Sequence, residues 1–114
     1  MVELLVRLTA APGQSQKLIQ ALLSVRRSLQ LEGVCQGARI ASDVDDANVV
    51  WYSEDWPGVE EFERHLRSQS FARLLSVVET GATMPLIECR VVSETRGLEY
   101  LAAMRGRANT DVQG

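Results

Sequence analysis

The sequence predicts an α+β fold of the ferredoxin-like kind, with βαββαβ order and an antiparallel sheet that carries helices on one face. Three observations support this prediction. The chain has 114 residues, which suits one domain. Its apolar residues follow strand-like and helix-like spacings in turn. Short segments rich in glycine, proline or aspartate separate these stretches, as expected at turns.

The first half of the pattern begins with an apolar strand at residues 2–9 and a Pro12-Gly13 turn. A helix is expected over 14–31, because one set of apolar residues recurs every three or four positions: Leu18, Leu22, Val25 and Leu29. Gly33 ends this helix, since glycine is common just past a helix terminus. The remaining strands of the sheet are expected at residues 34–43, 48–56 and 84–95.

The second helical region is split. It is expected over residues 58–67 and 70–80, with Ser70 as the N-cap of the second part. Leu98 to Met104 could add one or two helical turns. We therefore place the domain at residues 1–104 and expect a disordered tail at 105–114, which shows no apolar periodicity.

Charge and hydropathy exclude several partners. The net charge is −3 and no basic stripe occurs, so nucleic acid is not expected to bind. No apolar run approaches the roughly 20 residues that span a bilayer, and the first residues do not resemble a signal peptide. We expect a cytoplasmic protein that does not bind membranes.

The two cysteines predict neither a metal site nor a disulfide. Cys35 and Cys89 belong to no CxxC motif, and no histidine lies at ligand spacing from either. In the usual ferredoxin-like order they would lie near opposite sheet edges, too far apart to bridge. We expect reduced, buried thiols and no metal.

The strands carry apolar residues at both alternating positions, as at Val49-Val50 and Val91-Val92. Both sheet faces are then expected to be buried, although helices cover only one of them. A second copy of the chain is the simplest cover for the other face, so we expect a homodimer.

Both tryptophans, one of the two tyrosines and the sole histidine of the chain lie in one segment. An aromatic strand, Val49-Val50-Trp51-Tyr52-Ser53-Glu54-Asp55-Trp56, runs into the helix that holds the sole histidine, His65. Histidine is the side chain whose ordinary pKa lies near physiological pH. This segment is the candidate site.

The chain resembles the antibiotic biosynthesis monooxygenase (ABM) domain of the dimeric α/β-barrel superfamily over roughly residues 2–95. The resemblance rests on the opening strand with its Pro12-Gly13 turn, the Glu54-Asp55-Trp56 motif, the His65-Leu66 pair nine positions after Trp56, the Ser70-Phe71 turn and the apolar strand after Pro85. It implies a dimeric α/β barrel, either domain-swapped or face-to-face, with a cavity between sheet and helices.

The resemblance also implies a function, a cofactor-independent monooxygenase acting on a phenol- or quinol-like aromatic molecule. A second hypothesis is a non-catalytic small-molecule-binding or interaction module on the same scaffold. The haem-degrading branch uses an Asn, a Trp and a His at positions that here are near Val6, His65 and Leu75. Leucine cannot ligate iron, so we expect no haem and no other cofactor.

Each candidate residue has a functional and a structural interpretation. His65 is either a catalytic base for the substrate's phenolic proton or a half-buried packing residue. Trp51 and Tyr52 point to opposite sheet faces, so one of them lines the cavity or both pack in the core. Three polar strand residues could also bind substrate: Asn48, Ser53 and Arg39.

Overall fold

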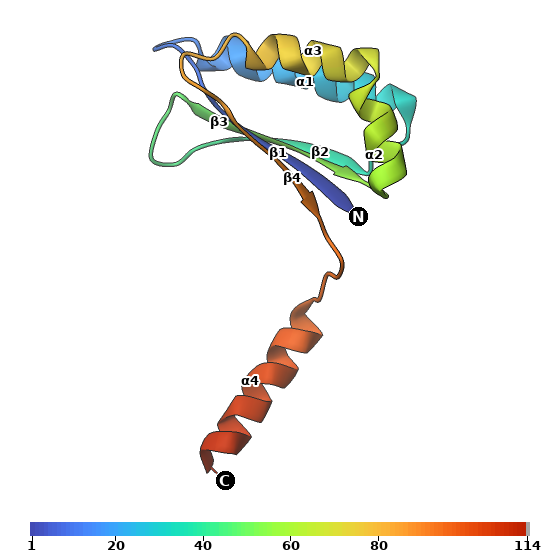
Figure 1. The fold of residues 1–114 in the computed structure, drawn as a ribbon. Helices are drawn as coiled ribbons and strands as arrows, with labels where there is room; N and C mark the ends of the chain where they lie inside the picture. Colours follow the sequence, from blue (N-terminus) through green and yellow to red (C-terminus); the bar gives the residue numbers. More distant parts are fainter. Residues whose placement is uncertain (114) are drawn as a thin grey trace.

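The computed structural model describes residues 1–113, and their side chains as far as Arg107. The elements follow the order β1 (Val2–Thr9), α1 (Ser15–Glu32), β2 (Gly37–Ser42), β3 (Val49–Trp56), α2 (Val59–Leu66), α3 (Gln69–Val78), β4 (Leu86–Val91) and α4 (Leu98–Gln113). The predicted βαββαβ order is therefore confirmed, with an additional C-terminal helix (Figure 1).

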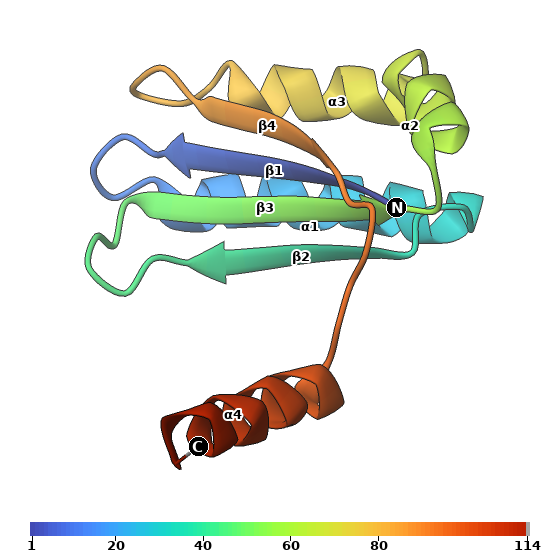
Figure 2. The same cartoon turned by 60° about the horizontal axis from the view of Figure 1, so that its bottom comes forward.

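The four strands form one antiparallel sheet in the order β2-β3-β1-β4. Helices α1, α2 and α3 all lie on one side of this sheet, and no helix of the described chain packs against the opposite side, toward which the detached helix α4 extends (Figures 1 and 2). This arrangement is the predicted α+β ferredoxin-like fold, with β2 and β4 as edge strands.

The core lies between the two central strands and helix α1. Alternate residues of β1 face the helices and are buried, namely Val2, Leu4, Val6 and Leu8. They meet the buried stripe of α1, which consists of the four predicted residues Leu18, Leu22, Val25 and Leu29. The helix ends at Gly33, whose φ of 77° is left-handed and whose N–H donates to the Leu29 carbonyl.

The start of α3 differs from the prediction. Ser68, and not Ser70, occupies the N-cap, where its Oγ accepts a hydrogen bond from the Phe71 N–H at 3.2 Å. Ser70 is buried instead and donates to a carboxylate oxygen of Glu32 near the end of α1. Either serine is suited to cap a helix. The hydrogen bond between Ser70 and Glu32 of α1 engages the Ser70 hydroxyl, and Ser68 takes the N-cap position.

Strand β4 lies at the edge of the sheet, and the helices do not cover it. All six of its residues are exposed, among them Cys89. Cys35 precedes β2 at the other edge, is partly buried and has a raised pKa because burial disfavours the thiolate. The two thiols are free in this chain, and the expected burial of Cys89 was wrong because the helix layer ends before β4.

Helix α4 extends away from the rest of the molecule (Figure 1). It runs to Gln113, through residues for which the sequence gave no apolar pattern and for which we expected a disordered tail. Its first two turns carry the leucine, alanine and methionine residues that favour a helix. Gly114 lies outside the described residues. No helix in the described part of the chain is long and apolar enough to cross a membrane.

Candidate functional site

A buried carboxylate, Glu54, organises the segment that the sequence singled out. Tyr52, Glu54 and Trp56 alternate along β3 and so point together toward the helices. The Tyr52 hydroxyl donates to Oε2 of Glu54 at 2.5 Å, and the Trp56 Nε1–H donates to Oε1 at 3.0 Å. The carboxylate is fully buried, so these donors replace the water that it loses on folding.

Helix α2 brings His65 against the same carboxylate. Its Nε2 lies 3.0 Å from Oε1 of Glu54, although the ring N–H does not point straight along this line. The ring stacks on Trp56 with centroids 4.2 Å apart, and the edge of Phe71 lies against it. Its other nitrogen, Nδ1, is 3.3 Å from the Ser68 hydroxyl. Every side of the ring is therefore occupied by the protein.

We call Tyr52, Glu54, Trp56 and His65 the carboxylate cluster. The cluster joins the end of β3 to helix α2 through polar contacts inside an otherwise apolar layer. Burial, followed by the charge of Glu54 and the hydrogen bond to it, holds the pKa of Tyr52 well above its ordinary value.

The raised pKa of Tyr52 predicts a loss of stability at alkaline pH. The unfolded chain releases the Tyr52 proton above about pH 10, whereas the folded chain keeps it. The unfolded state therefore binds fewer protons there, and the free energy of unfolding should fall as pH rises above about 10. Ultraviolet titration of tyrosinate should show Tyr52 staying protonated until the protein unfolds, and Tyr52→Phe should weaken the alkaline decline in stability. Ionisation of Tyr52 in the folded protein would contradict this prediction.

The other predicted site residues do not join the cluster. Trp51 and Ser53 point to the sheet face without helices, which answers the open question about Trp51 and Tyr52. Trp51 donates to Asp43 at 3.1 Å, and this hydrogen bond lowers the pKa of the Asp43 carboxyl. Arg39 lies on the same face and forms an ion pair with Asp55 at 2.6 Å.

Asn48 lies apart from all of these residues, in the loop before β3. Its backbone N–H donates to the Asp46 carboxylate at 2.9 Å, and its carbonyl accepts from the Ala10 N–H at 2.8 Å. Its backbone therefore fixes the turn between β2 and β3. The six predicted residues thus fall into three places: Tyr52 and His65 meet in the carboxylate cluster, Trp51, Ser53 and Arg39 share the sheet face without helices, and Asn48 lies in the loop.

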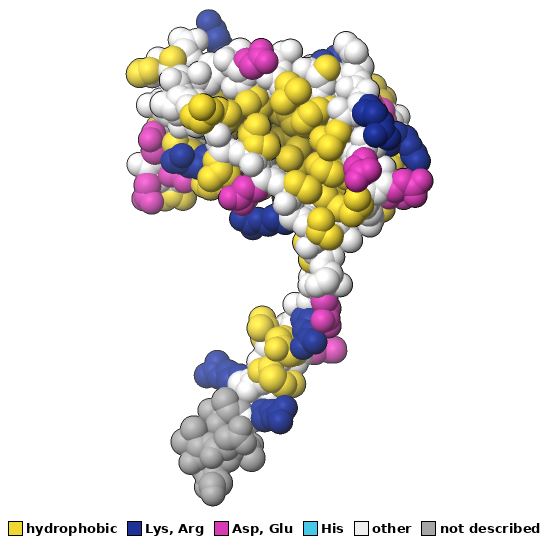
Figure 3. Space-filling view, in the orientation of Figure 1, with side chains coloured by type: hydrophobic (Ala, Val, Ile, Leu, Met, Phe, Trp, Pro, Cys, Tyr) yellow, Lys and Arg dark blue, Asp and Glu magenta, His cyan; other side chains and the backbone are white. Residues whose placement is uncertain are grey.

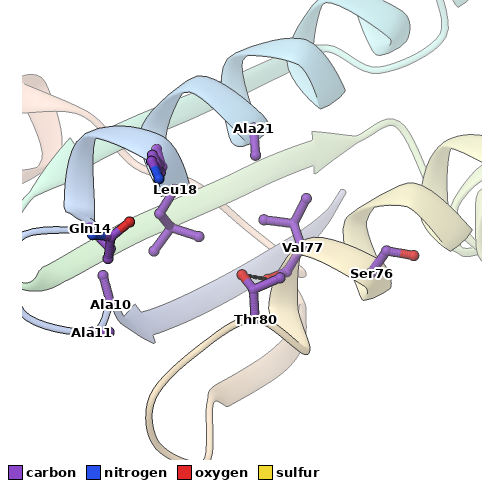
Figure 4. Close-up of a pocket in the computed structure, with 9 residues that line it drawn as sticks. Ala10, Ala11, Gln14, Leu18, Ala21, Ser76, Val77 and Thr80 are labelled. Carbon is purple, nitrogen blue, oxygen red and sulfur yellow. Dashed lines mark hydrogen bonds between the residues drawn. The ribbon is translucent and has the colours of Figure 1, made fainter.

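A pocket of about 430 Å³ opens elsewhere, between α1 and α3 beyond the end of β1 (Figure 4). Most of its surface is apolar, and its lining residues are Ala10, Ala11, Gln14, Lys17, Leu18, Ala21, Ser76, Val77 and Thr80. None of the six predicted site residues belongs to this set. We call this site the α1–α3 pocket.

The α1–α3 pocket has the size and chemistry of a small-molecule site. Ligand pockets are mostly apolar, with volumes of about 300–1,000 Å³ and a few polar groups. Small side chains such as Ala10 and Ala21 leave the space open, and Leu18 and Val77 face each other across it. Lys17 is exposed and forms no ion pair with any residue in the described part of the chain. The pocket can therefore hold an apolar molecule and place a cation beside an anionic group on it.

The first two thirds of the chain match a known protein family. The model of the family described as "Antibiotic biosynthesis monooxygenase" matches residues 1–75. The chain belongs to the antibiotic biosynthesis monooxygenase family. The match ends within α3, so β4 and α4 lie beyond it. It includes the whole carboxylate cluster and the α1 side of the α1–α3 pocket.

Solved structures of the ABM fold support the architecture. A Deinococcus radiodurans protein proposed to be an antibiotic biosynthesis monooxygenase has a TM-score of 0.75 at 17% identity, covering 86% of this chain and 98% of its own. A Mycobacterium tuberculosis protein has a TM-score of 0.71 at 13% identity, covering 84% and 98%. A Pseudomonas aeruginosa protein has a TM-score of 0.64 at 24% identity, covering 80% and 94%. No curated protein matches the sequence.

Proposed function

We propose that this ABM-family chain is a cofactor-independent monooxygenase that oxidises a phenol- or quinol-like aromatic molecule bound in the α1–α3 pocket. The observation that carries the proposal is an open apolar pocket with one ammonium group at its edge. Flat aromatic rings bury well against apolar side chains, and a phenolic oxygen would meet Lys17.

The protein's part in such a reaction is to bind the substrate and to favour its anion. A nearby ammonium group lowers the pKa of a phenol, so Lys17 would increase the fraction of phenolate in the pocket. The electron-rich phenolate then supplies electrons to oxygen. For an anthrone-type substrate, a ring CH2 becomes C=O, one oxygen atom enters the product, and the other leaves as water with the two hydrogens. No external reductant is needed for this balance.

The sequence-based assignment of His65 as the base stays a prediction. The ring lies inside the carboxylate cluster, and the pocket lining does not include it. A direct role would require the substrate to reach Nδ1 or Nε2, which here face Ser68 and Glu54. We favour a structural role, in which His65 holds α2 on the sheet.

Oxygen uptake tests both the activity and the role of His65. The purified protein, with no added cofactor, is expected to accelerate oxygen consumption by members of a panel of hydroquinones and anthrones. Lys17→Met should lower kcat/KM by roughly tenfold, the effect of losing about 1.4 kcal/mol of anion stabilisation. His65→Gln should retain most of the rate, provided that circular dichroism shows it is folded.

Two results would count against this assignment. If no substrate in the panel is consumed faster than without protein, the oxygenase proposal fails. If folded His65→Gln loses the rate while Lys17→Met keeps it, the base is His65 and the chemistry lies at the carboxylate cluster.

A non-catalytic binding module is the alternative function. One observation favours it: Lys17 is the single ionisable side chain in the pocket lining, so the lining offers no carboxylate or imidazole as a proton acceptor. Saturable binding of the same aromatic molecules without oxygen uptake would identify this function.

A further inference from the structure

The two helices that border the α1–α3 pocket offer it different polar groups. Lys17 of α1 carries an ammonium group, which donates hydrogen bonds and accepts none. Gln14, at the N-cap of α1, carries an amide that can both donate and accept. The two hydroxyl groups of the lining come from the other side, from Ser76 in α3 and from Thr80 just past its end.

The backbone of α3 already uses the hydrogens of both hydroxyl groups. Thr80 Oγ1 donates to the Val77 carbonyl at 2.6 Å, and Ser76 Oγ donates to the Ala72 carbonyl at 3.1 Å. The Thr80 N–H donates to the same Val77 carbonyl at 3.0 Å. A hydroxyl group has one hydrogen and two lone pairs, so each of these oxygens can only accept a further hydrogen bond. The α3 side of the pocket is therefore an acceptor side, opposite the ammonium donor on α1.

Thr80 is better placed than Ser76 to meet a ligand. In Figure 4 the Ser76 side chain points away from the other lining residues, whereas Thr80 lies among them. The C-terminal end of a helix also carries a negative partial charge, and the last turn of α3 contains no basic residue that would offset it. Near Thr80, this charge favours the hydrogen of a hydroxyl group and disfavours a carbonyl oxygen.

We infer that Thr80 makes the pocket select the reduced form of an aromatic ligand over its oxidised form. The inference rests on the proposed function, in which the α1–α3 pocket holds the substrate. A reduced ligand with one oxygen beside Lys17 can donate a second hydroxyl hydrogen to Thr80 Oγ1. In the oxidised form a carbonyl oxygen takes the place of that hydroxyl group, and its lone pairs face those of Thr80.

This selection would release the product of the proposed reaction. An anthrone-type substrate reacts as its enol, whose hydroxyl group becomes a ring carbonyl. One atom of O2 forms the second carbonyl at the ring carbon that loses its hydrogen, and the other atom leaves as water with that hydrogen and the enol hydrogen. The substrate thus has a donor for Thr80 and the product has none, so binding energy is given to the molecule before oxidation and withdrawn after it.

Dissociation constants for a matched pair of ligands test the inference without turnover. The pair is a dihydroxynaphthalene and the hydroxytetralone in which a ring carbonyl replaces one hydroxyl group, so both keep one phenolic oxygen for Lys17. NMR titrations in the absence of oxygen compare the wild type with Thr80→Val, which removes the hydroxyl group at nearly constant shape. Thr80 is exposed, so this change leaves no buried gap. Thr83→Val is the matched control, because Thr83 is exposed and lies outside the pocket lining.

The wild type and Thr83→Val should bind the diol about three- to tenfold more tightly than the ketone, the effect of one net hydrogen bond. Thr80→Ser keeps a hydroxyl group and should keep this preference. Thr80→Val should bind the two ligands with affinities within about twofold of each other, because neither the acceptor nor the opposing lone pairs remain. Equal affinities in the wild type would overturn the inference.

A second apolar surface offers another place where an aromatic molecule could bind. Figure 3 shows apolar side chains gathered between β4 and α3, where Leu75, Ile87 and Val91 are exposed. A ligand held there would not contact Thr80. A preference for the diol that Thr80→Val leaves unchanged would identify such binding and would also overturn the inference.

Oxygen uptake separates this inference from the proposed function. A preference for the diol that depends on Thr80, without oxygen uptake by any phenol, would support the inference and contradict the oxygenase. Oxygen uptake without such a preference would support the oxygenase and overturn the inference.

Discussion

Glu54→Leu is expected to lower the free energy of unfolding by about 3–5 kcal/mol. The substitution removes the acceptor for the Tyr52 hydroxyl and the Trp56 indole N–H, both of which stay buried. It also removes the charge beside His65 Nε2. Buried donors without a partner cost about 1–3 kcal/mol each. Most of the lost stability therefore comes from the Tyr52 hydroxyl and the Trp56 indole N–H, which are left without an acceptor.

Urea unfolding of matched variants measures this effect. Glu54→Gln keeps one acceptor oxygen and should cost less than Glu54→Leu. Glu88→Leu changes an exposed carboxylate on β4 and should stay within about 0.5 kcal/mol of the wild type. If Glu54→Leu costs no more than Glu88→Leu, the cluster does not hold α2 on the sheet as we describe.

Ala21→Phe is expected to weaken aromatic ligand binding by roughly tenfold or more, a change of at least about 1.4 kcal/mol. Ala21 lines the α1–α3 pocket from α1, opposite residues of α3, and a phenyl ring there occupies the space that the ligand needs. Ala72→Phe is the matched control, since Ala72 is exposed on α3 outside the pocket lining. Dissociation constants from NMR titration of the two labelled variants provide the comparison. Equal affinities would place the ligand elsewhere.

The fold could be predicted because its signals are periodic. The stripe of α1 was predicted residue by residue, since its four leucine and valine positions recur at helical spacing and all are buried. The alternation of β3 placed Trp51 and Tyr52 on opposite faces, but only the register with β1 shows that Tyr52 faces the helices. Local sequence shows which residues share a face of the strand, and strand pairing shows which face points toward the helices.

The site could be predicted only in part. Tyr52 and His65 do meet, but through Glu54, whose burial the sequence does not reveal because glutamate is rarely buried unless paired. The α1–α3 pocket was missed because alanines such as Ala10 and Ala21 carry no chemical signal, and the space depends on how two helices pack. Lys17 lay off the apolar stripe of α1 and was indistinguishable from an ordinary solvated charge.

The location of a bound ligand distinguishes the α1–α3 pocket from the carboxylate cluster as the binding site. The isotope-labelled wild-type protein is titrated with an aromatic phenol, and the backbone amides whose NMR signals shift are identified. We expect the shifts to centre on Ala10, Ala21, Val77 and Thr80, around the α1–α3 pocket. Shifts centred on Trp56 and His65, with the pocket amides unchanged, would contradict it.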